Sequence, residues 1–275
     1  MWIINSILNK IFEIIFLPFR GVSPWAGMIV VSLLTGFLML FIYRHTSNQA
    51  GIRSVKDKIK AHLLEIRLFK DNMGVSLKAQ GNILLANFRY IAYAFKPLLV
   101  MIVPIILILV QLNFWFAYRA LEPGETAILK VKLAKGQNPL QTEVVVEPSP
   151  AFEIETTALR IDEDNSMSWR LRAKEKGLHS IRFRLGNQTL VKTITVGQRP
   201  LTKISPLKVD RNFLDQVLYP AEKPLPADAP VKSIEISFPE KKMNFFGWHI
   251  HWLVVYFALS IILGFAFKGI FKVEI

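Results

Sequence analysis

Three long stretches without a charged side chain constrain what this 275-residue chain can fold into. Residues 26–43, 97–118 and 250–267 contain no Asp, Glu, Lys or Arg and are 18, 22 and 18 residues long. A helix needs about 20 residues to cross roughly 30 Å of hydrocarbon, so the second stretch suffices alone and the others need a flanking turn or a thinner bilayer. Core helices of soluble proteins keep a polar stripe, which these stretches lack. The sequence therefore predicts an integral membrane protein with three transmembrane helices, at residues 23–44, 97–119 and 248–268.

The charges outside these stretches are unevenly distributed. Residues 44–96 hold ten Lys and Arg against three acids, whereas residues 119–242 hold twenty against sixteen. Positive charge near membrane ends keeps a short loop in the cytoplasm, but a long segment is translocated whatever its charge. We therefore expect residues 44–96 and the C-terminus inside, and the N-terminus and residues 119–246 outside. This orientation suits a multi-pass protein of a bacterial cell inner membrane, with the endoplasmic reticulum as the alternative.

Residues 1–22 have the pattern of an amphipathic helix. Five polar side chains fall on one face of that helix and Ile, Leu and Phe cover the rest, as in a helix that lies in the membrane interface. A cleaved signal peptide is an alternative, although no small-residue cleavage site follows. A fourth spanning helix would place charges near the middle of the bilayer. The polar residues are Asn5, Ser6, Asn9, Lys10 and Glu13.

Residues 45–96 are typical of two antiparallel amphipathic helices, similar to a short coiled coil. Ser54 and Asp57 have the spacing of a capping box and predict where the first helix starts. Apolar residues recur every three to four positions on both sides of a break at 72–74, so we expect the two apolar stripes to pair. The stripes are Val55, Ile59, Leu63, Ile66 and Met73, followed by Leu77, Leu84, Phe88, Ile91 and Phe95. The outer surface of this cytoplasmic hairpin carries Arg53, Lys56, Lys60, Arg67, Lys70, Lys78 and Arg89.

Residues 120–198 change to short segments rich in Val, Ile, Thr and Phe, separated by turn residues. Several strands at this spacing indicate an extracytoplasmic all-β, immunoglobulin-like sandwich, with a hairpin over residues 178–196. Residues 199–247 contain seven of the fifteen prolines and predict an extended connector with a short helix near 209–219. Residues 269–275 form a cytoplasmic tail.

The sequence contains no recognisable catalytic constellation. It has no cysteine, which excludes disulfides, thiolate metal sites and cysteine nucleophiles. Nucleophile-elbow, phosphate-loop, zinc-protease and dinucleotide-binding motifs are absent. His249 and His251 are expected to pack at the membrane boundary on different helix faces, and Asp162–Asp164 to be a solvated turn. We therefore predict a protein that is not an enzyme and has no metal or cofactor.

The predicted spans contain mild polarity but no Asp, Glu, Lys or Arg, which argues against an ion-coupled transporter. Ser32 and Thr35 lie in the first span, Gln111 and Asn113 in the second, and Ser260 in the third. These side chains can form hydrogen bonds between helices. The alternative is a partly wet groove, open to the cytoplasm, in which a polar segment of another protein sheds its water gradually.

The order of the predicted elements resembles that of the Oxa/YidC/Alb insertase superfamily. Ser23–Pro24–Trp25–Ala26–Gly27 is similar to the Gly/Asn–Trp–Gly opening of the family's first span. Lys96–Pro97–Leu98–Leu99–Val100–Met101–Ile102–Val103–Pro104–Ile105 resembles the proline-punctuated start of its second conserved helix. The likeness covers residues 1–118 and 248–275. The β-region between the second and third spans departs from the usual family arrangement.

The resemblance implies an insertase that lowers the barrier for client membrane helices in a hydrophilic groove, without nucleotide hydrolysis. Clients would contact Ser32, Thr35, Gln111 and Asn113. Bacterial members carry an arginine inside the first span; here the stretch around Phe37 is apolar, and Arg44 either serves the groove from its mouth or is a positive-inside anchor. The basic hairpin would meet a ribosome, client flanks or anionic lipid, with no specific nucleic-acid sequence. The alternative is a non-catalytic structural subunit of a larger envelope complex, with partners on the β-domain and the hairpin.

Overall fold

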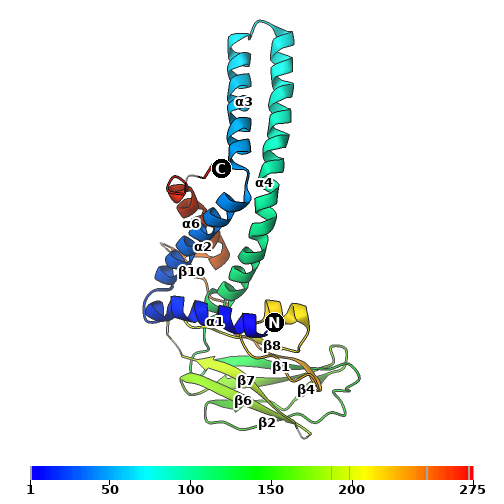
Figure 1. Cartoon of the computed structure of the whole chain (residues 1–275). Coiled ribbons are helices and arrows are strands. Elements are labelled where there is room, and N and C mark those ends of the chain that lie inside the picture. Colours follow the sequence, from blue (N-terminus) through cyan, green and yellow to red (C-terminus); the bar gives the residue numbers. More distant parts are fainter. Residues whose placement is uncertain (1, 187, 198, 246, 272, 275) are drawn as a thin grey trace. The chain divides into compact units, whose positions relative to one another are not determined.

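The computed structural model describes residues 2–186, 188–197, 199–245, 247–271 and 273–274. The chain forms two compact units, a β-rich unit of residues 1–28 and 107–255 and a helical unit of residues 29–106 and 256–275. The helices are α1 (Trp2–Phe16), η1 (Leu17–Phe19), α2 (Pro24–Thr46), α3 (Gln49–Leu68), α4 (Met73–Phe116), α5 (Phe213–Leu218) and α6 (Trp252–Phe267) (Figure 1). The strands are β1 (Thr126–Leu133), β2 (Val145–Val146), β3 (Phe152–Ile154), β4 (Leu159–Ile161), β5 (Ser166–Ala173), β6 (Gly177–Leu185), β7 (Gln188–Val196), β8 (Leu207–Val209), β9 (Val231–Ile236), β10 (Met243–Phe245) and β11 (Trp248–Ile250).

Two helices, α2 and α4, are long and apolar enough to cross a membrane. The third predicted span is shorter than expected: α6 has 16 residues, and Trp248–Ile250 form strand β11 instead of its first turn. His249 therefore lies in a strand and not on a helix, which corrects the predicted helical placement of His249 and His251. The coarse prediction of a helical part with apolar spans and a separate β-region is confirmed.

Helix α4 is a single helix of 44 residues, about 66 Å long at 1.5 Å per residue. Its sequence contains Pro97 and Pro104, where we expected the hairpin to end and a separate span to begin. Apolar helices tolerate proline when the freed carbonyl groups find other partners, and the flanking Leu, Val and Ile side chains favour continuation. The hairpin and the second predicted span therefore share one continuous helix.

The pair formed by α3 and the first half of α4 differs from the predicted hairpin in two ways (Figure 1). Helix α3 begins at Gln49, because the side chain of Asn48 caps it by accepting a hydrogen bond from the Gly51 amide at 2.9 Å. The predicted start at Ser54 is therefore wrong. The predicted pairing of the two stripes is also wrong, because the stripe on α4 is exposed and small side chains take the inner positions. The buried residues of the pair are Ile52, Val55, Ala79 and Ala86.

The β-rich unit contains two larger antiparallel sheets around one apolar core and a small two-stranded sheet formed by β10 and β11. One sheet has the order β3–β5–β1–β9–β8, with β4 also paired to β5, and the other has the order β2–β6–β7. Side chains from both sheets, such as Leu129, Trp169, Phe183 and Ile194, belong to the same buried cluster. Burial alternates along β1 and β6, as expected for strands with one face on a core. The predicted β6–β7 hairpin is present, and Asn187 of its turn lies outside the described residues.

The predicted connector at residues 199–247 is largely structured. Strand β9 pairs with β1 in the middle of the larger sheet, β8 pairs with β9, and α5 lies between them in sequence. The seven prolines lie outside these short elements, so the segment keeps its turns and still supplies strands. Val231, Ile234 and Ile236 provide the alternating apolar face that closes the core. The all-β region therefore extends well beyond residue 198.

Candidate functional site

Helix α1 is fixed to the β-rich unit through the polar face that the sequence predicts. Asn5 donates a hydrogen bond to the carbonyl oxygen of Gln216 at 2.7 Å, and Asn9 donates one to that of Pro220 at 2.7 Å. Both asparagines are buried. These two side chains of the polar face therefore contact protein instead of water. Their amide groups supply hydrogen-bond donors to backbone carbonyl oxygens in and after α5.

The opposite side of α1 is an exposed apolar stripe. At 3.6 residues per turn, its members lie on the side facing away from Asn5 and Asn9. Phe12 and Phe16 are buried on the inner side, where the Phe16 ring lies 4.7 Å from that of Trp115. Helix α1 therefore separates a protein-facing side from an apolar side that no described residue covers. The exposed residues are Ile3, Ile4, Ile7, Ile11, Ile14 and Leu17.

Two of the predicted groove residues lie with other polar side chains between α2 and α6. Ser32 and Thr35 of α2 are buried. The Tyr256 side chain of α6 lies near Thr35 and Ser260. A Cβ atom on Gly36 would come within 3.6 Å of the Ser260 carbonyl oxygen, so the two backbones approach closely. Tyr256 was not predicted as part of this group, although a tyrosine inside an apolar run is a signal for it.

This hydroxyl cluster, defined as Ser32, Thr35, Tyr256 and Ser260, is incompletely satisfied. The Ser32 hydroxyl oxygen is buried and has no hydrogen-bond partner among the described residues, whereas the Tyr256 hydroxyl lies close to those of Thr35 and Ser260. An unpaired buried hydroxyl costs roughly 1–3 kcal/mol, so such groups normally find water or a ligand. The cluster can therefore accept or donate hydrogen bonds to a molecule that enters between the helices.

The other predicted groove residues lie elsewhere. Gln111 and Asn113 belong to the β-rich unit, where Gln111 is buried and its Oε1 atom has no partner among the described residues. Asn113 interacts with the side chain of Tyr118. Arg44 is exposed in the last turn of α2, where a cation is favourable next to the negative end of the helix dipole. The structure brings Ser32 and Thr35 together within the helical unit.

The predicted basic surface divides into paired and unpaired cations. Arg53 and Lys56 lie 2.9 and 3.9 Å from carboxylate oxygens of Glu274 in the C-terminal tail, and Lys60 lies 3.8 Å from Asp57. The hydrogen bond from Arg53 lowers the pKa of the Glu274 carboxyl. Four other cations of the hairpin have no ion pair among the described residues and remain available to a partner. They are Arg67, Lys70, Lys78 and Arg89.

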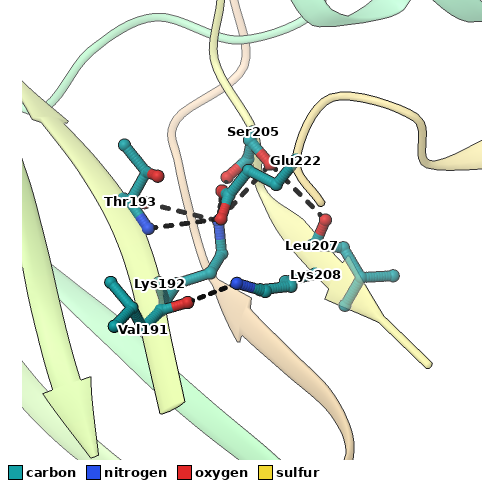
Figure 2. Close-up of polar contacts among 7 residues, drawn as sticks. All are labelled: Val191, Lys192, Thr193, Ser205, Leu207, Lys208 and Glu222. Carbon is teal, nitrogen blue, oxygen red and sulfur yellow. Dashed lines mark hydrogen bonds and ion pairs between the residues drawn. The ribbon is translucent and has the colours of Figure 1, made fainter. Parts of the chain in front are cut away.

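A buried ion pair in the β-rich unit was not predicted. Lys192 points inward from β7, on the same face of the strand as Leu190, Ile194 and Val196. Its side chain is 0% exposed. Its ammonium group donates to the Glu222 carboxylate and to the Ser205 carbonyl oxygen at 2.6 Å (Figure 2). Desolvation lowers the pKa of Lys192, and Glu222 opposes that effect. A lysine in an inward position of the alternating pattern was the signal for this site.

Other lysines surround Glu222. Lys208 donates to the carbonyl oxygen of Val191 at 2.6 Å (Figure 2). Lys203 donates to Asn9 at 2.9 Å and lies 3.5 Å from Glu13 of α1. Burial lowers the pKa of Lys203 and of Lys208, and Glu222 raises both. This region of the β-rich unit therefore concentrates positive charge next to α1.

Metal-binding clusters of three or more His, Asp or Glu side chains are absent among the residues that the structure describes. Asp164, which the sequence analysis assigned to a solvated turn, pairs with Lys130 at 2.7 Å. The Lys130 ammonium group lowers the pKa of the Asp164 carboxyl.

Comparisons with known proteins place no constraint on these sites. No protein-family model, curated protein or solved structure matches the chain. The function is therefore inferred from the two exposed apolar stripes and the buried polar groups described above.

Proposed function

We propose that this chain is an insertase-like membrane protein of the Oxa/YidC/Alb type, which assists insertion or assembly of other membrane proteins without hydrolysing a nucleotide. The observation that carries the proposal is the exposed stripe of α4. Leu77, Leu84, Phe88, Ile91 and Phe95 are all exposed, and Phe88 is 70% exposed. A contiguous exposed apolar patch on a protein usually marks an interaction surface. We therefore expect this stripe, on a cytoplasmic helix, to bind an apolar partner.

The stripe continues along α4 into its most apolar part. At 100° per residue, Leu98, Ile102 and Ile106 fall on the same side of the helix as Leu84 and Phe95. All three are exposed in the helical unit. Residues 77 to 106 therefore present one apolar surface about 44 Å long at 1.5 Å per residue. A client helix can stay in contact with it on its way from water into lipid.

Charge next to the stripe supports the same function. Lys78, Arg89 and Lys96 lie in a row about a third of a turn from the stripe. Cations at this place attract anionic lipid, a ribosome or acidic flanks of a client, and hold the hairpin on the cytoplasmic side. The hydroxyl cluster would then receive polar parts of the client in the helical unit, with Arg44 as a further contact there, and Gln111 and Asn113 would be separate client contacts in the β-rich unit.

The membrane arrangement is part of the proposal. Helices α2, α4 and α6 would form three spans, with α6 using its flanking residues to reach sufficient length. The immunoglobulin-like β-region and the N-terminus would lie outside a bacterial inner membrane, with α1 in the interface and the hairpin and C-terminus in the cytoplasm. Protease added to sealed right-side-out vesicles should cut residues 119–246 and spare residues 44–96. Cleavage of both segments would overturn this topology.

Photo-crosslinking tests the client path directly. A photoreactive residue in place of Phe88 or Ser32 should capture nascent membrane proteins on ribosomes, and one at Gln111 tests the other unit. The same probe at Lys58, which is exposed on α3 outside the stripe, is the matched control. Capture of lipid alone, or capture at Lys58 equal to that at Phe88, would contradict the proposal.

A structural subunit of a larger envelope complex is the second candidate, because a permanent partner would cover the same stripe. Purification in mild detergent should then recover partners of fixed stoichiometry, with the crosslinks from Phe88 going to one of them. Recovery of the chain alone would remove this candidate.

A further inference from the structure

A cavity of about 490 Å³ lies in the β-rich unit beside α1. Glu13 of α1, Arg20, Thr193 of β7 and the loop that carries Arg199 and Lys203 line it. Glu222 also lines it, and the buried ion pair of Glu222 with Lys192 borders this part of the unit (Figure 2). Cavities of a few hundred Å³ with several converging polar groups are the usual size of small-ligand sites.

The charges that line this cavity do not balance. Both carboxylates already have cationic partners, since Glu222 pairs with Lys192 and Glu13 with Lys203. Arg20 and Arg199 have no ion pair among the described residues. The cavity therefore offers two uncompensated guanidinium groups, and no carboxylate on its wall lacks a cation.

The Arg20 guanidinium is held in place before any ligand binds. It lies 5.8 Å from the centre of the Trp115 ring, and Trp115 is buried against Phe16. A stacked guanidinium keeps its donors free for a second partner in the plane of the fork. The Thr193 hydroxyl adds a neutral donor on the same wall.

The remaining groups favour an anion with several oxygen atoms. Guanidinium groups bind phosphate and carboxylate through paired, charge-assisted hydrogen bonds. Lys203 is close by, and its burial lowers the pKa of its ammonium group, a cost that a bound anion would relieve. A cation or an apolar ligand would meet Arg20 and Arg199 unfavourably.

The flank of α1 points to the source of that anion. By helical geometry, Glu13 lies between the buried side of α1 and the exposed stripe that includes Ile14 and Leu17. A headgroup in the cavity could thus leave its acyl chains along the isoleucine side of the helix. We propose that this cavity binds the phosphate of an anionic headgroup, supplied by a phospholipid of the membrane in which α1 lies.

This inference rests on the membrane location of the proposed function, but not on client insertion. It is tested with the purified full chain in a neutral detergent, using short-chain phosphatidylglycerol, short-chain phosphatidylcholine and inorganic phosphate as three separate probes. Thermal unfolding and intrinsic tryptophan fluorescence, to which Trp115 beside Arg20 contributes, report binding. Phosphatidylglycerol should bind at least about tenfold more tightly than phosphatidylcholine.

Paired substitutions locate the binding. Arg20→Gln with Arg199→Gln should weaken phosphatidylglycerol binding about tenfold or more. The matched control, Arg170→Gln with Arg182→Gln, removes two exposed arginines of β5 and β6 and should leave binding unchanged. Arg199→Glu alone, at an exposed position, provides a second variant with little risk to folding, and should also abolish binding.

The outcomes separate the alternatives. Inorganic phosphate binding as tightly as phosphatidylglycerol, with the same sensitivity to Arg20 and Arg199, would support the phosphate site and assign it a soluble ligand. Equal binding of both lipids, or unchanged binding in both variants, would overturn the inference. Loss of lipid binding with crosslinking to clients intact would leave the proposed function standing, and the reverse result would leave this site standing.

Discussion

The two units differ in how they use charged and apolar side chains. In the β-rich unit, Lys192 is fully buried and meets a carboxylate and a backbone carbonyl group. In the helical unit, the Ser32 hydroxyl is buried without a partner among the described residues, and large apolar side chains are exposed on α4. The β-rich unit thus buries a charge together with its counter-ion. The helical unit buries no charged side chain among its described residues, and it exposes an apolar stripe for something outside the chain to cover.

The largest expected effect is on the stability of the β-rich unit and tests its buried Lys192–Glu222 ion pair. Glu222→Gln should destabilise this unit by about 3–5 kcal/mol, because it leaves the Lys192 ammonium group buried without its counter-ion. Thermal unfolding of the full chain, followed by tryptophan fluorescence, measures the change. Lys192→Met with Glu222→Gln is the matched control and should recover most of the loss. A single variant as stable as the double variant would show that the pair is not buried in solution.

The next effect distinguishes the two sides of α4. Ala86→Asp places a charge on the buried side and should destabilise the α3–α4 pair by roughly 2–4 kcal/mol. Phe88→Asp, two residues away on the exposed side, should change stability by no more than about 0.5 kcal/mol. It should nevertheless reduce crosslinking of clients to the stripe. Protease sensitivity of the hairpin and crosslinking yield are the two readouts, and equal sensitivity of both variants would contradict the assignment of the two sides.

A smaller effect concerns the hydroxyl cluster. Ser32→Ala removes a hydroxyl that has no partner among the described residues, so it should leave stability unchanged or raise it by at most about 1 kcal/mol, whereas Tyr256→Phe removes a hydroxyl next to Thr35 and Ser260 and should cost about 1 kcal/mol. If the cluster contacts clients, both variants should also lower insertion of a reporter membrane protein. Thr35→Val is the comparison within the cluster, because the Thr35 hydroxyl is not among the unpaired groups. A loss of stability in Ser32→Ala as large as that in Tyr256→Phe would show that the Ser32 hydroxyl is paired.

The smallest effect is a dependence on pH. The Arg119 guanidinium hydrogen-bonds to Glu125 at 2.8 Å and lowers the pKa of that carboxyl. A lowered folded-state pKa adds stability above the ordinary carboxylate range, and this stability is lost as the pH falls through the folded-state value. Because both side chains are partly exposed, the contribution is small. Unfolding of the chain between pH 3 and 6 should therefore show a slightly shallower acid loss in Glu125→Gln than in the unaltered protein.

Glu274→Gln is the comparison for that measurement. Glu274 also has a lowered pKa through an arginine, but its ion pair with Arg53 is solvent-exposed in the helical unit. Its removal should leave acid unfolding of the β-rich unit unchanged. A larger acid effect of Glu274→Gln than of Glu125→Gln would show that the two units do not differ in this respect.

The sequence predicts the parts of the molecule whose physics is local. Uncharged stretches locate α2 and α4, and alternation with turn residues locates β1, β6 and β7, because each depends on neighbours in sequence. The side on which the α4 stripe lies was not predictable, since the period of Leu84, Phe88 and Phe95 is the same whether or not they face α3. The pairing of β9 with β1 was also not predictable from the sequence, because it joins residues about 100 positions apart.

The candidate sites follow the same division. Ser32, Thr35 and Ser260 were found as rare polar residues in apolar runs, which is a local signal. Glu222 and Arg20 lie far from Lys192 and Arg199 in sequence, and only the fold brings each into its site. The docking of Asn5 and Asn9 on the chain around α5 likewise depends on contacts 211 residues apart.

The two prolines of α4 also have a directional consequence. Neither proline can donate a backbone hydrogen bond, so the carbonyl groups of Tyr93 and Val100 lose their usual partners in the helix. Pro97 and Pro104 are seven residues apart, which is nearly two complete turns, so both weak points have almost the same azimuth. Bending of the helix axis at Pro97 and at Pro104 therefore occurs in nearly the same plane, which gives α4 one preferred direction of bending.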